Sequence, residues 1–235
     1  MAQIAADREP GVTIANDDAR QLPRERPFSW QLASVVVRDR RTRLAIGGYL
    51  GHMWELYAMW ALISTFFANF FAARGHGNAT AIAYAGAAAF AVIAAGGIGS
   101  VLAGQWADRL GRERVTIWSM VVSGTCALTI GWLLDASPWL VVTVGVVWGF
   151  AIVADSAQFS AVVTEVAPPH AVGTALTLQT SLGFLLTAFS IWFTIQVQSR
   201  FGWPVAFGLP ALGPVFGIAA MLRLKNIRLA ATPGE

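Results

Sequence analysis

Residues 83–104 read AYAGAAAFAVIAAGGIGSVLAG, an uncharged run of small and apolar side chains. A helix needs about 20 mainly apolar residues to cross the hydrocarbon core of a bilayer, and this run meets that length. The whole chain has the same character, because 56% of its 235 residues are hydrophobic and only 12% are charged. An average soluble domain carries about 25% charged residues. The composition therefore predicts a polytopic membrane protein and excludes a soluble enzyme.

Five further stretches resemble this run, so the sequence predicts an all-α integral membrane protein with six transmembrane helices. Short turn or charge signals separate the stretches, and such short connections make neighbouring helices antiparallel. Pro204, Pro210 and Pro214 predict a kink in the last helix. The predicted spans are residues 44–73, 79–107, 115–134, 138–166, 173–197 and 204–222.

The charged residues divide the chain into three regions. Residues 1–43 hold 14 of the 29 charges and are expected to form a cytoplasmic lead or linker that is largely disordered. Residues 44–224 form the predicted membrane domain, and residues 225–235 a cytoplasmic tail. Twelve Lys and Arg flank one side of the spans, whereas Arg74 and Arg200 flank the other. Because cytoplasmic loops carry the excess of Lys and Arg, both termini are predicted to lie in the cytoplasm of a multi-pass cell-membrane protein.

Small residues recur at a four-residue spacing in several spans. This spacing allows the backbones of two helices to approach closely. We expect tight helix–helix contacts at these positions, which suit either static packing or helices that slide on one another. The pairs are Gly47/Gly51, Ala95/Gly99, Gly145/Gly149 and Gly213/Gly217.

The loop after the second span, residues 104–114, reads GQWADRLGRER. Gly104 is expected to let helices approach, and Asp108 to face the positive end of a neighbouring helix dipole. Gly111 permits a tight turn. The alternative is an ordinary positively charged cytoplasmic loop. The loop is expected to be held at the cytoplasmic face by its arginines, Arg109, Arg112 and Arg114.

The pattern G-x-x-x-D-R-x-G-R-x-R in this loop resembles the signature of the major facilitator superfamily. In that family the signature recurs between helices 2 and 3 and, more weakly, between helices 8 and 9. Residues 48–60, GYLGHMWELYAMW, are similar to the seventh helix of a group of bacterial facilitators. Residues 153–187 are similar to helices ten and eleven of that group, and residues 28–43 to the end of the loop between its two halves.

The resemblance covers residues 28–224 and implies the C-terminal half, helices 7–12, of a twelve-helix transporter. That half is built from two inverted three-helix repeats, with the substrate site near the midplane. The first six helices of the fold have no counterpart in the sequence. We therefore expect a fragment, a truncated gene product, or a half-transporter that needs a second six-helix half or a second copy.

Two acidic residues lie deep in the predicted spans. Glu55 is about 16 Å into the first span at 1.5 Å per residue, and Asp155 is just past the middle of the fourth span. Ionisable residues inside a membrane are costly and point to a functional role. The resemblance implies the same two helices, because the first helix of each repeat lines the cavity in that fold. We predict that Glu55 and Asp155 bind substrate or protons, with a structural buried hydrogen bond as the alternative.

Three other polar residues are candidates for the same substrate or proton site. His52 and Gln158 each lie three residues from one of the two acids, on the same helical face. Gln179 belongs to a modest polar patch on the fifth span. Glu165, near the end of the fourth span, is expected to be an interfacial carboxylate with a minor role.

The predicted spans contain no Lys or Arg, so the two deep acids have no permanent cationic partner in this chain. A low-dielectric environment disfavours the charged form of a carboxylate. Each acid must therefore bind a proton, pair with charged His52, meet a cationic substrate or use a cation of another half. Proton-coupled transport follows as a hypothesis.

The sequence as a whole predicts secondary active transport of a small solute across the lipid bilayer by alternating access. It has no phosphate-binding P-loop, and its single cysteine and three scattered histidines predict no metal site and no cofactor. The basic residues lie beside the spans, so nucleic acid is not an expected partner. The alternatives are a transport-inactive fragment or assembly partner, and an intramembrane enzyme that uses the deep polar residues. The substrate and the direction of coupling are not indicated by the sequence.

Overall fold

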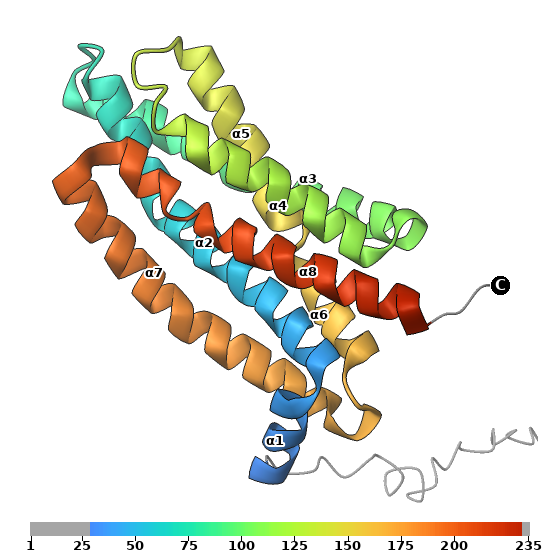
Figure 1. Cartoon of the computed structure of the whole chain (residues 1–235). Helices are drawn as coiled ribbons and strands as arrows, with labels where there is room; N and C mark the ends of the chain where they lie inside the picture. Colours follow the sequence, from blue (N-terminus) through green and yellow to red (C-terminus); the bar gives the residue numbers. More distant parts are fainter. Residues whose placement is uncertain (1–28, 232–235) are drawn as a thin grey trace, which may run out of the picture.

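A computed structural model describes residues 29–231, and this part of the chain is helical apart from short turns (Figure 1). The described residues contain no β-strand. The elements in chain order are α1 (Trp30–Arg38), α2 (Arg40–Ala72), α3 (Asn78–Leu110), α4 (Arg112–Ile130), α5 (Pro138–Ala154), α6 (Ser156–Val166), the 3₁₀ turn η2 (Pro169–Ala171), α7 (Val172–Gly208) and α8 (Leu212–Ala231).

The six predicted spans correspond to α2, α3, α4, the pair α5–α6, the first part of α7, and the end of α7 with α8. Four helical stretches are long and apolar enough to cross a bilayer, and the last of these, Pro169–Ala230, contains two predicted spans. The 19 residues of α4 are less apolar, but they rise about 28 Å, close to the roughly 30 Å of a hydrocarbon core. The predicted all-α fold with six membrane helices is confirmed.

Helical structure extends further at both ends than the charge pattern predicts. Residues 30–43 belong to α1 and the start of α2, so this part of the expected disordered lead is helical. Ser29 and Asp39 cap these two helices, because each side chain accepts a backbone N–H of the following turn. The lead's residues 1–28 lie outside the described part of the chain. At the other end, α8 continues to Ala231, into the predicted tail.

The segment that joins the last two spans is bent twice. Gly202, inside α7, has a φ of 77°, a conformation that favours glycine. A second break at residues 209–211 separates α7 from α8 and contains Pro210. Trp54 of α2 donates its indole N–H to the carbonyl of Leu209 at 3.1 Å, which satisfies a backbone group at this break. The kink that the prolines predict is therefore present.

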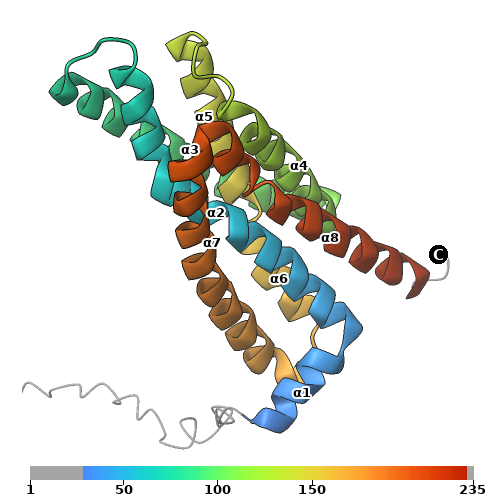
Figure 2. The same cartoon turned by 60° about the vertical axis from the view of Figure 1, so that its left-hand side comes forward.

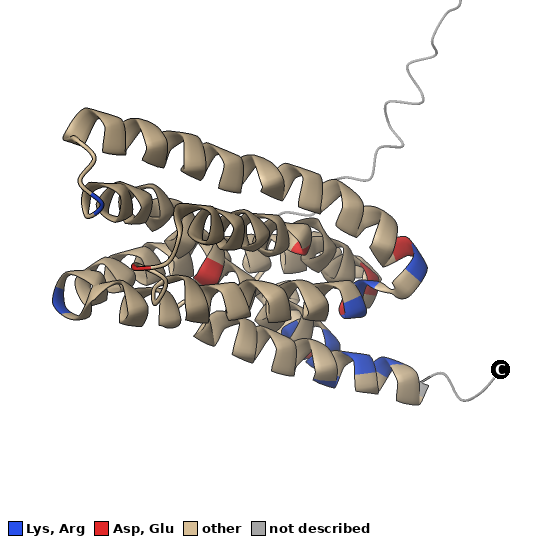
Figure 3. Cartoon of the chain, turned by 90° about the horizontal axis from the view of Figure 1, so that it is seen from above, with Lys and Arg blue, Asp and Glu red and all other residues tan. Residues whose placement is uncertain are grey.

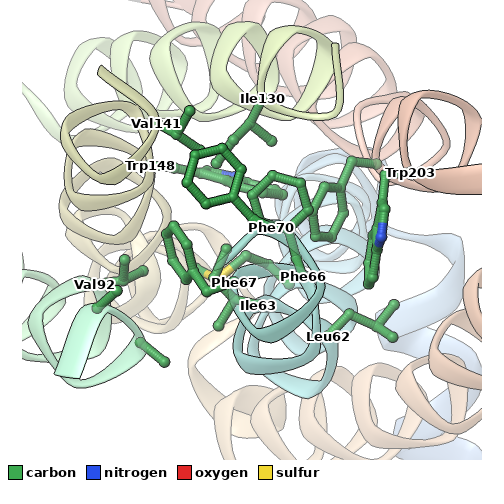
Figure 4. Packing of buried hydrophobic residues seen from close by; sticks show 14 of the residues in the cluster. Leu62, Ile63, Phe66, Phe67, Phe70, Val92, Ile130, Val141, Trp148 and Trp203 are labelled. Atoms are coloured by element: carbon green, nitrogen blue, oxygen red, sulfur yellow. The ribbon is translucent and has the colours of Figure 1, made fainter. Parts of the chain in front are cut away.

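The central helix of the bundle is α2. It packs against α7 and α8, and also against α3 and α6 (Figure 1, Figure 2). Towards its C-terminal end its side chains form an aromatic core with α5 and with the segment around Trp203 (Figure 4). Phe66 contacts Trp203 edge-on at 5.3 Å between ring centroids, and Trp148 contacts Phe207 at 5.1 Å.

Glycines allow the closest helix contacts. Gly51 of α2 lies against the backbone of Gly213 and Gly217 in α8, and Gly149 of α5 lies against the carbonyl of Val92 in α3. A Cβ at Gly51 or Gly149 would overlap these backbone atoms. The tight contacts expected from the small-residue spacing are therefore confirmed for α2 with α8 and for α3 with α5.

Lys and Arg gather at one end of the bundle, the end at which α8 finishes (Figure 3). The opposite end carries Arg74, which follows α2, and Arg200, which lies near the bend in α7. Arg74 donates to the backbone carbonyl of Leu134 at 2.8 Å and so ties two turns of this end together. This grouping agrees with the charge asymmetry of the sequence. The end that carries most of the Lys and Arg is called the arginine-rich end below.

We expect Gly149→Ala to destabilise the protein, because the new methyl group would meet the backbone of α3. Overpacking of this kind costs about 1–3 kcal/mol. The buried thiol of Cys126 provides the measurement, because a thiol-reactive dye labels it when the bundle unfolds on heating. Gly86→Ala on α3 is the matched control, since no atom lies within 4 Å of its Cβ position. Equal dye-labelling midpoints for the two variants would contradict the assigned contact.

Candidate functional site

Glu55 connects α2 to two other helices. Its Oε1 accepts the indole N–H of Trp148 from α5, and its Oε2 accepts the hydroxyl of Ser123 from α4, each at 2.8 Å. The side chain is 1% exposed. Because both oxygens accept a hydrogen bond, the cost of burying this carboxylate is partly offset. Sequence reasoning missed Trp148 and Ser123, since neither residue type is unusual in a membrane helix.

His52 turns to a different partner from Glu55, although the two lie one helical turn apart. Its Nδ1 lies 2.9 Å from Oδ1 of Asp155, and both side chains are buried. The two atoms form an ion pair when His52 is protonated, and neither His52 Nε2 nor Asp155 Oδ1 has a hydrogen-bond partner among the described residues. The rings of Phe159 and Tyr49 pack beside the imidazole. This pair therefore keeps unused hydrogen-bonding capacity in an apolar environment, which costs free energy and is the kind of arrangement that a functional role would explain.

Asp155 also marks an interruption of the fourth span. The first helix of this span, α5, ends at Ala154 and α6 begins at Ser156. The carbonyl of Asp155 accepts the N–H groups of Gln158 and Phe159, so the residue stands at the start of α6. A broken helix inside a membrane is tolerated where protein or a cavity surrounds it. The His52–Asp155 pair thus lies at the one-residue interruption between α5 and α6.

Arg112 is the centre of an ionic cluster at the arginine-rich end. Its Nε donates to Oε1 of Glu165 at 2.6 Å, and its Nη1 donates to Oε1 of Gln158 at 2.7 Å. Gln158 is 3% exposed, so the guanidinium reaches from the end of the bundle towards the interior. One short helix, α6, therefore carries Asp155 at its start, the Arg112-bound Gln158 within its first turn, and Glu165 near its end.

The C-terminal helix α8 joins this cluster. Arg228 donates through Nη1 to Glu113 at 2.7 Å and to Glu165 at 3.0 Å. Sequence reasoning gave Glu165 a minor role and did not select the other two residues. Arg228 and Glu113 are 115 positions apart, so no local spacing could have indicated that they meet.

The glycines of the signature loop have different roles. Gly111 has a φ of 89° and forms the turn between α3 and α4, as expected. Gly104 makes no close helix contact within the described residues, because a Cβ on it would meet none of their atoms within 4 Å. The close approach of α3 to α5 is made instead by Gly96 and Gly99, which lie eight and five residues before Gly104.

The charged residues of the same loop also differ in the ion pairs that they form. Asp108 has a 74% exposed side chain, and its nearest described ionic partner is Arg112, the first residue of α4, at 3.9 Å. Arg109 and Arg114 are exposed and form no ion pair within the described part of the chain. Of the three arginines, Arg112 alone thus belongs to the ionic cluster.

Gln179 links α7 to α6. Its Nε2 donates to the hydroxyl of Ser160 at 3.1 Å, while its Oε1 has no partner among the described residues. The side chain is buried, whereas its neighbours Thr177 and Thr180 are exposed. The structure therefore places Gln179 in a buried polar contact and leaves one acceptor free. Within the described residues, no three His, Cys, Asp or Glu side chains are grouped so that they could hold a metal ion.

Residues 38–234 match the sequence profile of the Major Facilitator Superfamily, and the chain belongs to this family. No curated protein matches the sequence at a significant level. The fold is similar to the crystal structure of an auto inhibited POT family peptide transporter, with a TM-score of 0.69 and 14% sequence identity. The match covers 80% of this chain and 37% of that transporter, so the chain spans well under half of its length. The family and the fold are those of a membrane transporter and not of an enzyme.

We expect Glu165→Gln to weaken the arginine-rich end more than Asp108→Asn, because Glu165 accepts from both Arg112 and Arg228. Partly exposed ion pairs contribute about 0.2–1 kcal/mol each, and salt screens them. Heating with dye labelling of Cys126 should show a lower midpoint for Glu165→Gln in dilute buffer and a smaller difference in high salt. Equal midpoints for the two variants in dilute buffer would show that Glu165 does not organise the cluster.

Proposed function

We propose that the chain is one six-helix half of a secondary active transporter that moves a small solute by alternating access. Its family and its membrane-length helices support membrane transport. The need for a second half, or a second copy, is supported by the match to 37% of a solved transporter. In the two three-helix repeats, α2 and the pair α5–α6 take the equivalent first positions. The polar residues of these helices are therefore the candidates for contact with solute or protons.

The observation that carries a proton-coupled mechanism is the buried pair of His52 and Asp155. Within the described residues of the spans, no Lys or Arg neutralises this carboxylate. A proton on Asp155 removes its attraction to charged His52, and a buried group without a partner is costly. Binding and release of a proton would therefore change the contact between α2 and the break in the fourth span.

The helix that follows this break, α6, connects Asp155 to the arginine-rich end. Gln158 and Glu165 of α6 both accept from Arg112, the residue of the signature loop at which α4 begins. A tilt of α6 at Asp155 would displace both acceptors, so Arg112 would have to follow or exchange partners. This coupling is the switch role that we assign to the loop. Glu55 differs, since its two oxygens already accept from neutral donors, and we assign it mainly to holding the helices together.

We expect Asp155→Asn to keep solute exchange and to abolish accumulation driven by a pH gradient, because the amide cannot release a proton. The measurement uses proteoliposomes that contain the chain with its completing half and a solute selected by a binding screen. Glu55→Gln should reduce accumulation less, since glutamine can still accept from Trp148 and donate to Ser123.

Asp135→Asn is the matched control for the charge, because Asp135 is exposed in the turn before α5. Accumulation by Asp155→Asn at the level of this control would refute the proton role. Loss of solute binding in Asp155→Asn, with exchange also lost, would favour a cationic solute that contacts the carboxylate.

The proposed orientation places the arginine-rich end and both termini in the cytoplasm of the cell membrane. In a Cys126→Ala background, Gly77→Cys and Ser199→Cys should react with an impermeant thiol reagent in intact cells. Leu110→Cys, at the arginine-rich end, should react only after the cells are permeabilised. All three positions are exposed, so accessibility within the bundle does not decide the result. Labelling of Leu110→Cys alone in intact cells would reverse the orientation.

A further inference from the structure

An apolar groove of about 400 Å³ opens between α3 and α4 near the arginine-rich end. Its size is within the range of ligand pockets, roughly 300–1,000 Å³. Two tryptophans line it, Trp106 and Trp118, which are 44% and 68% exposed, so the groove is open along its walls. The walls and floor come from three helices: Trp106 and Leu110 of α3, Trp118 and Val122 of α4, and Ala151 and Ala154 of α5.

Two arginines lie close in the chain to the tryptophans of this groove, on the two sides of the turn between α3 and α4. Arg109 follows Trp106 by three residues, and Arg114 precedes Trp118 by four. Residues at these spacings lie on one side of a helix, so each arginine borders the wall formed by its tryptophan. Both are exposed, and neither forms an ion pair with a described residue.

The acidic residues of this end bind other cations. Glu113 accepts from Arg228, Glu165 accepts from Arg112 and Arg228, and the nearest described cation to Asp108 is Arg112, at 3.9 Å. The groove therefore combines apolar walls with two positive charges that these acids do not neutralise. Tryptophan rings favour the level of the lipid headgroups, and basic residues beside a span attract anionic lipids. An amphiphile with an acyl chain and a negatively charged headgroup satisfies both features.

We propose that this groove binds one anionic phospholipid, with an acyl chain between Trp106 and Trp118 and its phosphate between Arg109 and Arg114. The floor residue Ala154 directly precedes Asp155, so a bound chain adjoins the break between α5 and α6. Occupancy would oppose movement of the end of α5 into the groove. The binding itself does not depend on the transport role, and the test below requires no transport.

Tryptophan quenching by dibrominated lipids tests the proposal on the whole chain in phosphatidylcholine bilayers. Dibrominated phosphatidylglycerol should quench more strongly than the same amount of dibrominated phosphatidylcholine. The excess should disappear in the double variant Trp106→Phe/Trp118→Phe, because these rings line the groove. Arg109→Gln/Arg114→Gln should weaken the apparent affinity for phosphatidylglycerol by about 10–30-fold, the effect expected for the loss of two basic residues near the membrane surface.

Arg41→Gln/Arg43→Gln is the matched control, because both arginines are exposed at the same end and lie on α2, away from the groove. It should keep the preference for phosphatidylglycerol. Ser119→Phe should fill the groove while both groove arginines remain, and it should also lose the preference. Dye labelling of Cys126 shows whether the groove variants fold. If they do not, the variant Arg109→Lys/Arg114→Lys is used in their place, and it should retain binding of phosphatidylglycerol.

Three results would overturn the proposal. The first is equal quenching by the two lipids in the native chain. The second is an equal loss of the preference in the α2 control, which would show a general attraction of the arginine-rich end. The third is a normal preference in folded Ser119→Phe, which would show that no acyl chain enters the groove.

Discussion

A carboxylate inside a membrane bundle has no water to solvate it, so Glu55 of α2 needs hydrogen-bond donors from neighbouring helices. The way it obtains them determines how α2, α4, α5 and α7 are arranged. Its oxygens accept hydrogen bonds from Trp148 of α5 and Ser123 of α4. The same Trp148 is fully buried in the aromatic core, where it contacts Phe207 beside the bend between α7 and α8. The hydrogen bond thus sets the rotation of α2 relative to α4 and α5, and the core packing holds the indole in place. Because α2 is the central helix, its rotation also decides where His52 points.

The polar contacts of α6 extend this arrangement from the interior to the arginine-rich end. Asp155 lies beside His52 of α2, Gln158 binds Arg112 of α4, and Glu165 binds Arg112 and Arg228 of α8. With its N-cap Asp155, this helix of 11 residues therefore has polar or ionic contacts with four spans besides its own, because Ser160 also accepts from Gln179 of α7. Interactions at the exposed end are individually weak, so partner exchange there costs little. The interior pair is buried and costly to separate, which is why we propose it as the point of control for a movement of α6.

The number of helices, the charge asymmetry of the two ends and the family were all readable from the sequence. Hydropathy and turn residues are local properties, so the runs of residues 44–73 and 79–107 identify spans without any tertiary information. The deep positions of Glu55 and Asp155 follow from the same counting. The signature of residues 104–114 is equally local, and the φ of Gly111 agrees with the turn expected there. The glycine spacings predicted close contacts, although they did not tell which helices would meet.

The partners of the buried polar groups were decided by the tertiary structure alone. Equal spacing suggested that His52 and Glu55 act together, yet one meets Asp155 and the other meets Trp148 and Ser123. A turn of helix fixes only the rough direction of a side chain, and the neighbours that fill each direction come from spans far away in the chain. The same reason explains Gly104, which has the right sequence context but faces no helix in the bundle. Membrane insertion follows from the composition of each segment, whereas the pairing of polar groups depends on how all six spans rotate and pack together.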